Sequence, residues 1–227
     1  TVQQDSVFQA LTPQEQQAFN NLYEDYYYHR HNDFWYAEAM KKLPALVQST
    51  RMLVCAEDLG MVPACVKPVL DNLRILSLEI QTMPKVLGQT FARLEDNPYR
   101  SVATIFTHDM PTLRGWWQED YQRTQRYYNQ VLLHHGFAPQ QISGELCQEV
   151  IIRHLACPSM LCLISLQDWL SIDEEVRFSD IYAERINIPA NPNNYWGYRM
   201  HLNIEDLIAN TALSARIRKL IADNGRA

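Results

Sequence analysis

The sequence contains the stretch Ser101-Val102-Ala103-Thr104-Ile105-Phe106-Thr107-His108-Asp109, an apolar run that ends on a histidine and an aspartate. A short apolar run rich in β-branched residues predicts a buried strand. Two further runs share the pattern: Met52 to Ala56 leads into Glu57-Asp58, and Met160 to Leu166 leads into Gln167-Asp168. Parallel α/β folds place their chemistry at the exits of strands. These acidic strand ends are therefore the first candidates for a functional site.

The segments around these runs predict alternating strands and helices. Residues 73–80 read as a further strand, and residues 63–73, 113–135 and 144–156 carry helical patterns, the second ending before Gly136. Such alternation predicts a parallel sheet covered by helices. Four strands are too few for a closed eight-stranded barrel, so the sheet is either open and doubly wound or half of a barrel. No glycine-rich nucleotide loop follows a strand, which favours the half barrel.

The two ends of the chain are predicted to be helical. Residues 1–50 form a helical lead-in, where Thr12 to Glu15 is a capping box that starts one helix. Asn32-Asp33 is expected to cap a second helix, which Pro44 kinks or ends. Residues 204–222 carry one or two further helices. We therefore expect a single partial domain over 1–227, with strands and site residues in 51–170 and a closing loop and helices in 171–227.

The composition limits the class of protein. The 227 residues are 47% hydrophobic and 20% charged, which is typical of a globular protein. The net charge of −6 argues against a nucleic-acid or acidic-membrane partner. Five cysteines without a Cys-x-x-Cys pair read as buried free thiols in a reducing compartment, so we expect a cytoplasmic protein. The sequence shows no metal-binding motif and no apolar run of about 20 residues that could span a membrane.

Each candidate has a structural alternative. Glu57 is a candidate general acid/base, but a carboxylate there could equally cap a helix. His108 beside Asp109 is a candidate clamp for sugar hydroxyls or a hydrogen-bonded structural residue. Of Trp116 and Trp117, one is expected in the core and either could contact a ligand. The aromatic loop 195–198 suits sugar stacking or packing. Glu79 and Asp168 are expected either to support the residues that contact substrate or to be structural, and for Asp168 a structural role is favoured.

Three motifs resemble the 4-α-glucanotransferases (amylomaltase, disproportionating enzyme) of glycoside hydrolase family 77. They are Ala56-Glu57-Asp58-Leu59-Gly60, residues 76–85, and Thr107-His108-Asp109-Met110-Pro111-Thr112-Leu113-Arg114-Gly115-Trp116-Trp117. Residues 166–170 and 185–189 resemble the closing segments of the same family, so the resemblance covers the chain from about Arg30 onward.

The resemblance implies a fold, a reaction and a set of roles. The chain would be the C-terminal half of a TIM (β/α)₈ barrel, with about four parallel strands. It would help to move α-1,4-glucan segments between maltodextrin, starch or glycogen chains, or to glucose, with retention and without a metal or organic cofactor. Glu57 would be the general acid/base and Asp109 the residue that stabilises the transition state. His108, Asp58, Asn187 and Trp116 would contact substrate.

One part of the family's machinery is expected outside this chain. The nucleophilic aspartate belongs on the strand before Glu57, in an Arg-x-Asp motif, and residues 1–50 read as helix instead. Since retaining catalysis needs both carboxylates, the chain alone is expected to be inactive and to pair with the remaining N-terminal part of the same protein. The alternatives are a non-catalytic α-glucan-binding or scaffold module and an α-amylase-like hydrolase.

Overall fold

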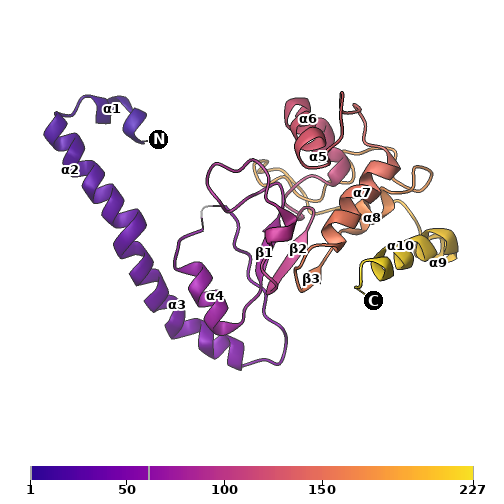
Figure 1. The fold of residues 1–227 in the computed structure, drawn as a ribbon, viewed down its shortest axis with the longest axis horizontal. Coiled ribbons are helices and arrows are strands. Elements are labelled where there is room, and N and C mark those ends of the chain that lie inside the picture. Colours follow the sequence, from indigo (N-terminus) through magenta and orange to yellow (C-terminus); the bar gives the residue numbers. More distant parts are fainter. Residues whose placement is uncertain (1, 61, 227) are drawn as a thin grey trace. The chain divides into compact units, whose positions relative to one another are not determined.

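The computed structural model describes residues 2–60 and 62–226. The chain divides into two compact units, Thr1–Ser77 and Leu78–Ala227, and each is described by itself (Figure 1). In the described part, no helix combines the length and the apolar character that crossing a membrane requires.

The first unit is dominated by a long helical segment. After η1 (Val2–Gln4) and α1 (Ser6–Gln9), the chain forms α2 (Pro13–Glu24), the π-helical η2 (Asp25–Arg30) and α3 (His31–Gln48). These last three follow one another in a continuous rod (Figure 1). The predicted capping box is confirmed: Thr12 Oγ1 accepts from the Glu15 N–H, and Glu15 Oε2 accepts from the Thr12 N–H at 2.9 Å.

The predicted boundary at Asn32-Asp33 is wrong. Asn32 lies inside α3, where its amide donates to the Tyr28 carbonyl at 2.9 Å and its Oδ1 accepts from the Cys65 N–H at 3.2 Å. Pro44 does not end the helix either, since α3 continues to Gln48. A proline inside a helix removes one hydrogen bond of the ladder, and α3 tolerates that loss.

The predicted strand 52–56 is reduced to one parallel bridge between Cys55 and Leu76. The Ala56 N–H donates to the Leu76 carbonyl at 2.8 Å, and the Leu76 N–H donates to the Val54 carbonyl at 3.0 Å. Met52 is 77% exposed and Leu53 52% exposed, so the apolar run is not buried as predicted. The predicted helix in 63–73 is present as α4 (Val66–Leu73).

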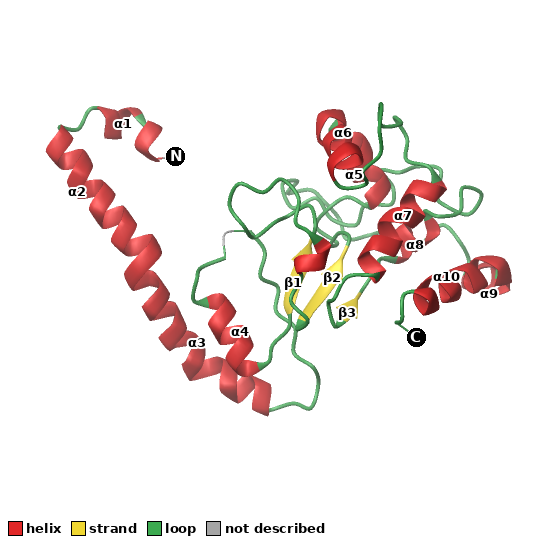
Figure 2. Ribbon diagram, in the orientation of Figure 1, coloured by secondary structure: helices red, strands yellow, loops and turns green. Residues whose placement is uncertain are grey.

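The second unit is built on a three-stranded sheet of β1 (Ser77–Ile80), β2 (Ser101–Thr104) and β3 (Leu161–Cys162). Ser77, the first residue of β1, is also the last residue of the first unit. The strands lie side by side in that order (Figure 2). β2 and β3 are parallel, with Val102 opposite Leu161 and Ala103 opposite Cys162. All four residues of β2 are buried. The predicted α/β class is thus confirmed, although the strand predicted over 160–166 is only two residues long.

Helices make up most of the other regular structure of this unit. They are α5 (Leu113–Glu119), α6 (Tyr121–Gln130), α7 (Gly144–Leu155), α8 (Leu166–Leu170), α9 (Ile204–Ala209) and α10 (Thr211–Asp223), with the short η3 (Leu94–Asp96) before β2. The single helix predicted over 113–135 is wrong. Asp120 adopts an extended conformation and accepts from the Arg123 N–H at 3.1 Å, so it ends α5 and caps α6.

A large hydrophobic core and a small cluster of Leu94, Ala103 and Cys157 hold the second unit together. Trp117, Leu113, Ile151 and Leu170 are nearly fully buried in the large core. All five cysteines are free, as predicted. Cys65, Cys147 and Cys157 are buried and Cys162 is partly buried, whereas Cys55 is exposed, as are Met52 and Leu53 of the same run.

Candidate functional site

His108 and Asp109 lie in the turn that follows β2. The turn is closed by the Met110 N–H, which donates to the Thr107 carbonyl at 3.0 Å. His108 Nε2 and Asp109 Oδ1 are 3.5 Å apart, and the two side chains are 49% and 41% exposed. The turn therefore presents both groups to solvent while the buried strand before it fixes their backbone.

Asn187 joins these two residues from a distant part of the sequence. Its side-chain amide donates to Asp109 Oδ1 at 2.6 Å, and its backbone N–H donates to the His108 carbonyl at 3.1 Å. Asn187 Oδ1 in turn accepts from Asn194 Nδ2 at 2.8 Å. The structure thus brings together three of the predicted site residues in one hydrogen-bonded group.

A buried ion pair joins two residues that are near this group in sequence, Arg114 and Glu184. The Arg114 guanidinium donates to Glu184 Oε1 at 2.9 Å, and the two side chains are 8% and 2% exposed. Glu184 Oε2 accepts from the Thr112 hydroxyl at 3.1 Å. Burial raises the pKa of Glu184, while the Arg114 charge acts to lower that pKa. This pair connects the start of α5 to the segment that carries Asn187.

Asp168 secures the same end of α5. Its Oδ1 accepts from the Leu113 N–H at 2.8 Å, and its Oδ2 accepts from the Ser165 hydroxyl at 2.9 Å. Burial raises the pKa of Asp168 to about 6, against the opposing effect of those two hydrogen bonds. Asp168 is 2% exposed. Its contacts are those of a structural residue, as the sequence predicted, although it lies in α8 and not at a strand exit.

A small cavity of about 160 Å³ connects these features. Its lining includes His108, Thr112, Gln167, Asp168 and Glu184. The exposed His-Asp turn and the buried carboxylates therefore belong to one continuous region of the second unit.

Trp116 does not have the exposed position that the expected contact with substrate requires. Its indole is 3% exposed and lies among Phe106, Phe91 and Tyr127, with the Arg123 guanidinium 4.4 Å from the ring centroid. A ring enclosed in this way has no face left for a sugar. Both Trp116 and Trp117 pack in the core, because α5 lies with this face against the unit's interior.

Glu57 and Asp58 belong to the first unit. They follow the Cys55 bridge, and Glu57 is exposed while Asp58 is partly buried. Both line a cavity of about 370 Å³ whose other walls come from α3 and α4, including Trp35, Leu43 and Val69. Glu57 is thus accessible on its own unit, as a proton donor and acceptor must be.

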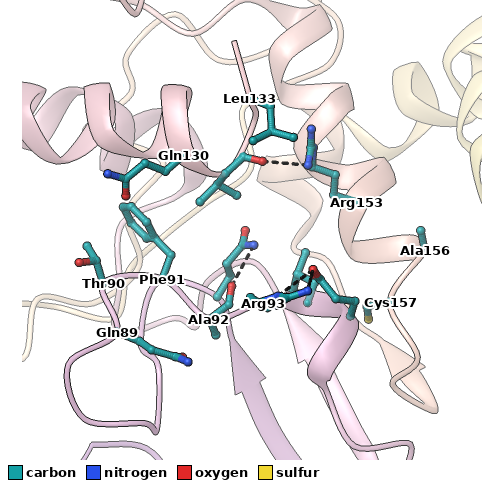
Figure 3. A pocket seen from close by; sticks show the side chains of 14 residues that line it. Gln89, Thr90, Phe91, Ala92, Arg93, Gln130, Leu133, Arg153, Ala156 and Cys157 are labelled. Carbon is teal, nitrogen blue, oxygen red and sulfur yellow. Dashed lines mark hydrogen bonds and ion pairs between the residues drawn. The ribbon is translucent and has the colours of Figure 1, made fainter. Parts of the chain in front are cut away.

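Another cavity, of about 660 Å³, lies in the second unit among the β1–β2 connection, α6 and α7 (Figure 3). Two of its polar side chains, Gln81 and Arg153, already have protein partners. The Gln81 amide donates to the Ala92 carbonyl at 3.3 Å, and Arg153 donates to the carbonyls of Val131 and Leu132 at 2.9 and 3.0 Å. No predicted site residue lines it, and we assign it no ligand.

Three residues of this region, Arg114, Thr112 and Glu184, are not predicted from the sequence. Thr112 and Arg114 lie inside the motif 107–117, but Glu184 carries no local signal, since it is a carboxylate in a loop. Asp168 could have been placed correctly, because Ser165-Leu166-Gln167-Asp168 has the spacing of a helix start. Across residues 2–60 and 62–226, no three His, Cys, Asp or Glu side chains are grouped to hold a metal ion.

Comparison with known sequences decides the family. The model of glycoside hydrolase family 77, described as 4-alpha-glucanotransferase, matches residues 6–204. The chain belongs to this family. Its His108-Asp109 turn and its Glu57-Asp58 segment both lie within the matched region.

The relatives of the chain are longer proteins. It is 35% identical over 221 residues to 4-alpha-glucanotransferase DPE2 of Oryza sativa subsp. japonica, covering 97% of this chain and 23% of that protein. It is 28% identical over 181 residues to the 4-alpha-glucanotransferase of Chlamydia muridarum, covering 78% of this chain and 34% of that one. The chain therefore spans about a quarter to a third of the length of these curated relatives.

The fold has solved counterparts at low identity. The amylomaltase from Streptococcus agalactiae in complex with acarbose superposes with a TM-score of 0.58 at 18% identity, over 76% of this chain and 32% of that one. The amylomaltase from Corynebacterium glutamicum gives 0.56 at 18% identity, over 74% and 28%. These likenesses support the α/β fold.

Proposed function

We propose that this chain is the C-terminal half of the (β/α)₈ catalytic barrel of a 4-α-glucanotransferase. The full-length protein would transfer α-1,4-glucan segments between maltodextrin, starch or glycogen chains, or to glucose, with retention of configuration. The family match over residues 6–204 supports the reaction class. The observation that carries the proposal is the hydrogen bond of 2.6 Å from Asn187 to Asp109, because it brings together two residues, far apart in sequence, that are proposed for the same site.

The proposed roles follow from chemistry and exposure. Glu57 donates a proton to the glycosidic oxygen and then removes one from the acceptor hydroxyl, which requires an accessible carboxyl group. Asp109 stabilises the positive charge that develops on the sugar ring in the transition state. His108, Asn187 and Asp58 bind sugar hydroxyls, since imidazole, amide and carboxylate groups supply both donors and acceptors.

A retaining mechanism needs a second carboxylate as nucleophile. We propose that this aspartate belongs to the remaining N-terminal part of the full-length protein, which fits the coverage of about a quarter to a third of the relatives. The 227 residues alone would then have no turnover. We further propose a cytoplasmic enzyme that uses no metal or organic cofactor and binds neither nucleic acid nor membrane.

The decisive variant is Glu57→Gln in the full-length protein, with Glu24→Gln, an exposed glutamate of α2, as the matched control. We expect Glu57→Gln to lose transfer by about 10²–10⁴-fold or more while maltodextrin binding is retained. Glu24→Gln should keep full activity. Unchanged transfer in Glu57→Gln would refute the acid/base role, and a parent protein that binds maltodextrin without any transfer would instead be a non-catalytic α-glucan-binding module.

A further inference from the structure

The loop 187–196 is fastened to the His-Asp turn at its start. Asn187 makes two hydrogen bonds to that turn, one through its backbone and one through its side chain. The Asn194 side-chain amide donates to Asn187 Oδ1 at 2.8 Å. This hydrogen bond joins the end of the loop to its beginning. The Asn191 N–H donates to the Ile188 carbonyl at 2.8 Å and closes a turn between them. The loop is therefore held over His108 and Asp109.

Trp196 follows Asn194 in the loop and faces the same turn. Its ring centroid lies 5.1 Å from that of His108, with the two planes tilted by 49°. The residue is nevertheless 64% exposed, so a large part of the indole remains open to solvent. The loop thus sets an open aromatic surface directly beside the polar groups of His108, Asp109 and Asn187.

We infer that Trp196 is a stacking platform for one pyranose ring of the glucan bound at the His108–Asp109 turn. This inference rests on the proposed function, which supplies the glucan. A pyranose ring has an apolar face of C–H groups and a rim of hydroxyls, so it binds best where an aromatic face meets hydrogen-bonding side chains. The indole provides the aromatic face, whose negative potential attracts C–H groups. The neighbouring carboxylate, imidazole and amide groups provide the hydrogen bonds.

Three other aromatic residues of the unit, Trp116, Trp117 and Tyr99, do not offer this combination. Trp116 and Trp117 are 3% and 1% exposed and serve the core. Tyr99 is 66% exposed, close to the value of Trp196, but it precedes β2, whereas His108 and Asp109 follow that strand. Tyr99 is therefore a matched control with equal exposure at the opposite end of the same strand.

The first test compares Trp196→Ala, Trp196→Phe and Tyr99→Ala in the full-length protein, with maltotriose as substrate. We expect Trp196→Ala to raise KM about tenfold with a smaller change in kcat, because stacking holds the substrate before and during the reaction. Trp196→Phe keeps a flat ring and should recover most of the loss. Tyr99→Ala should remain within twofold of the parent protein. A KM of Trp196→Ala equal to that of Tyr99→Ala would overturn the inference.

The second test measures binding without turnover. Maltoheptaose is added to the Glu57→Gln protein while tryptophan emission is recorded, with and without the added Trp196→Phe change. A saturable emission change that disappears with Trp196→Phe supports the platform. An identical change in both proteins contradicts it. If the parent protein makes no transfer products but the Trp196-dependent change is present, the proposed reaction fails and the glucan platform stands. If both are absent, both fail.

Discussion

Two segments of the chain share one sequence pattern but differ in environment. Residues 101–109 form a buried strand followed by a turn that Asn187 holds in place. Residues 52–58 should be equivalent, yet Met52 and Leu53 are largely exposed and the pairing is a single bridge to Leu76. A sequence suited to burial that remains open is typical of a surface that another segment covers. We therefore expect the remaining part of the full-length protein to complete the environment of Glu57, whereas this chain completes that of Asp109.

Among the variants that test this comparison, Asp109→Asn is expected to have the largest effect, which is a loss of transfer activity. The substitution removes the negative charge but keeps the size of the side chain and an oxygen for the Asn187 amide. We expect kcat/KM for maltotriose transfer to fall at least about a hundredfold, as when a transition-state charge loses its electrostatic partner. The thermal midpoint of unfolding should change by less than about 2 °C. A variant with normal activity would remove Asp109 from the mechanism.

The buried ion pair provides the next prediction. Glu184→Gln leaves the Arg114 guanidinium buried without its carboxylate, which we expect to lower the free energy of unfolding by about 3–5 kcal/mol. The control is Asp71→Asn, which breaks the exposed Lys67–Asp71 pair of the first unit and should cost less than about 1 kcal/mol. Urea unfolding followed by tryptophan emission measures both. Equal losses of unfolding free energy in the two variants would show that the Arg114–Glu184 pair does not hold the start of α5 to the segment that carries Asn187.

A smaller effect, with a defined pH dependence, is expected from Asp168→Asn. Because the folded protein raises the pKa of Asp168 from 3.8 to about 6, the folded state holds this proton more tightly than the unfolded state does. Its contribution to stability is therefore complete below about pH 4 and is lost as pH rises through 6. Relative to Asp168→Asn, the wild-type protein should lose roughly 1–3 kcal/mol between pH 4 and pH 7.

The measurement is the difference in thermal midpoint between the two proteins at pH 4, 5.5 and 7. Burial also lowers the pKa of His154 to about 4, but that residue is unchanged in the variant and its effect cancels in the difference. A difference that does not vary with pH would show that Asp168 is ionised normally in the folded protein.

The sequence predicted those features that depend on local signals. The sequence predicts the capping box at Thr12 and the helix 144–155 well. The hydrogen bonds that cap these helices and the apolar pattern along them involve residues only a few positions apart. The break at Asp120 was missed although aspartate is a strong helix cap, since the apolar pattern continued across it. The prediction of a strand over 160–166 is wrong in its second half, because Ser165 caps the helix α8 that begins at Leu166.

Part of the candidate site could be proposed from the sequence for the same reason. Glu57, His108 and Asp109 could be proposed from motifs at strand ends. The burial of Trp116 and the ion pair between Arg114 and Glu184 depend on contacts between residues far apart in sequence, which no local pattern encodes. For the aromatic loop 195–198 the sequence leaves stacking and packing as equal alternatives, and the position of the Trp196 ring beside His108 favours stacking.

The central claim is that this chain supplies part of a retaining glucan-transfer site. Its most direct test is product analysis after maltotriose is incubated with the full-length protein and, separately, with the 227-residue chain. The account predicts a ladder of longer maltodextrins together with glucose from the full-length protein, and no products from the chain alone. Accumulation of glucose and maltose without longer chains would indicate hydrolysis, and a ladder from the chain alone would show that it carries its own nucleophile; either result would contradict the account.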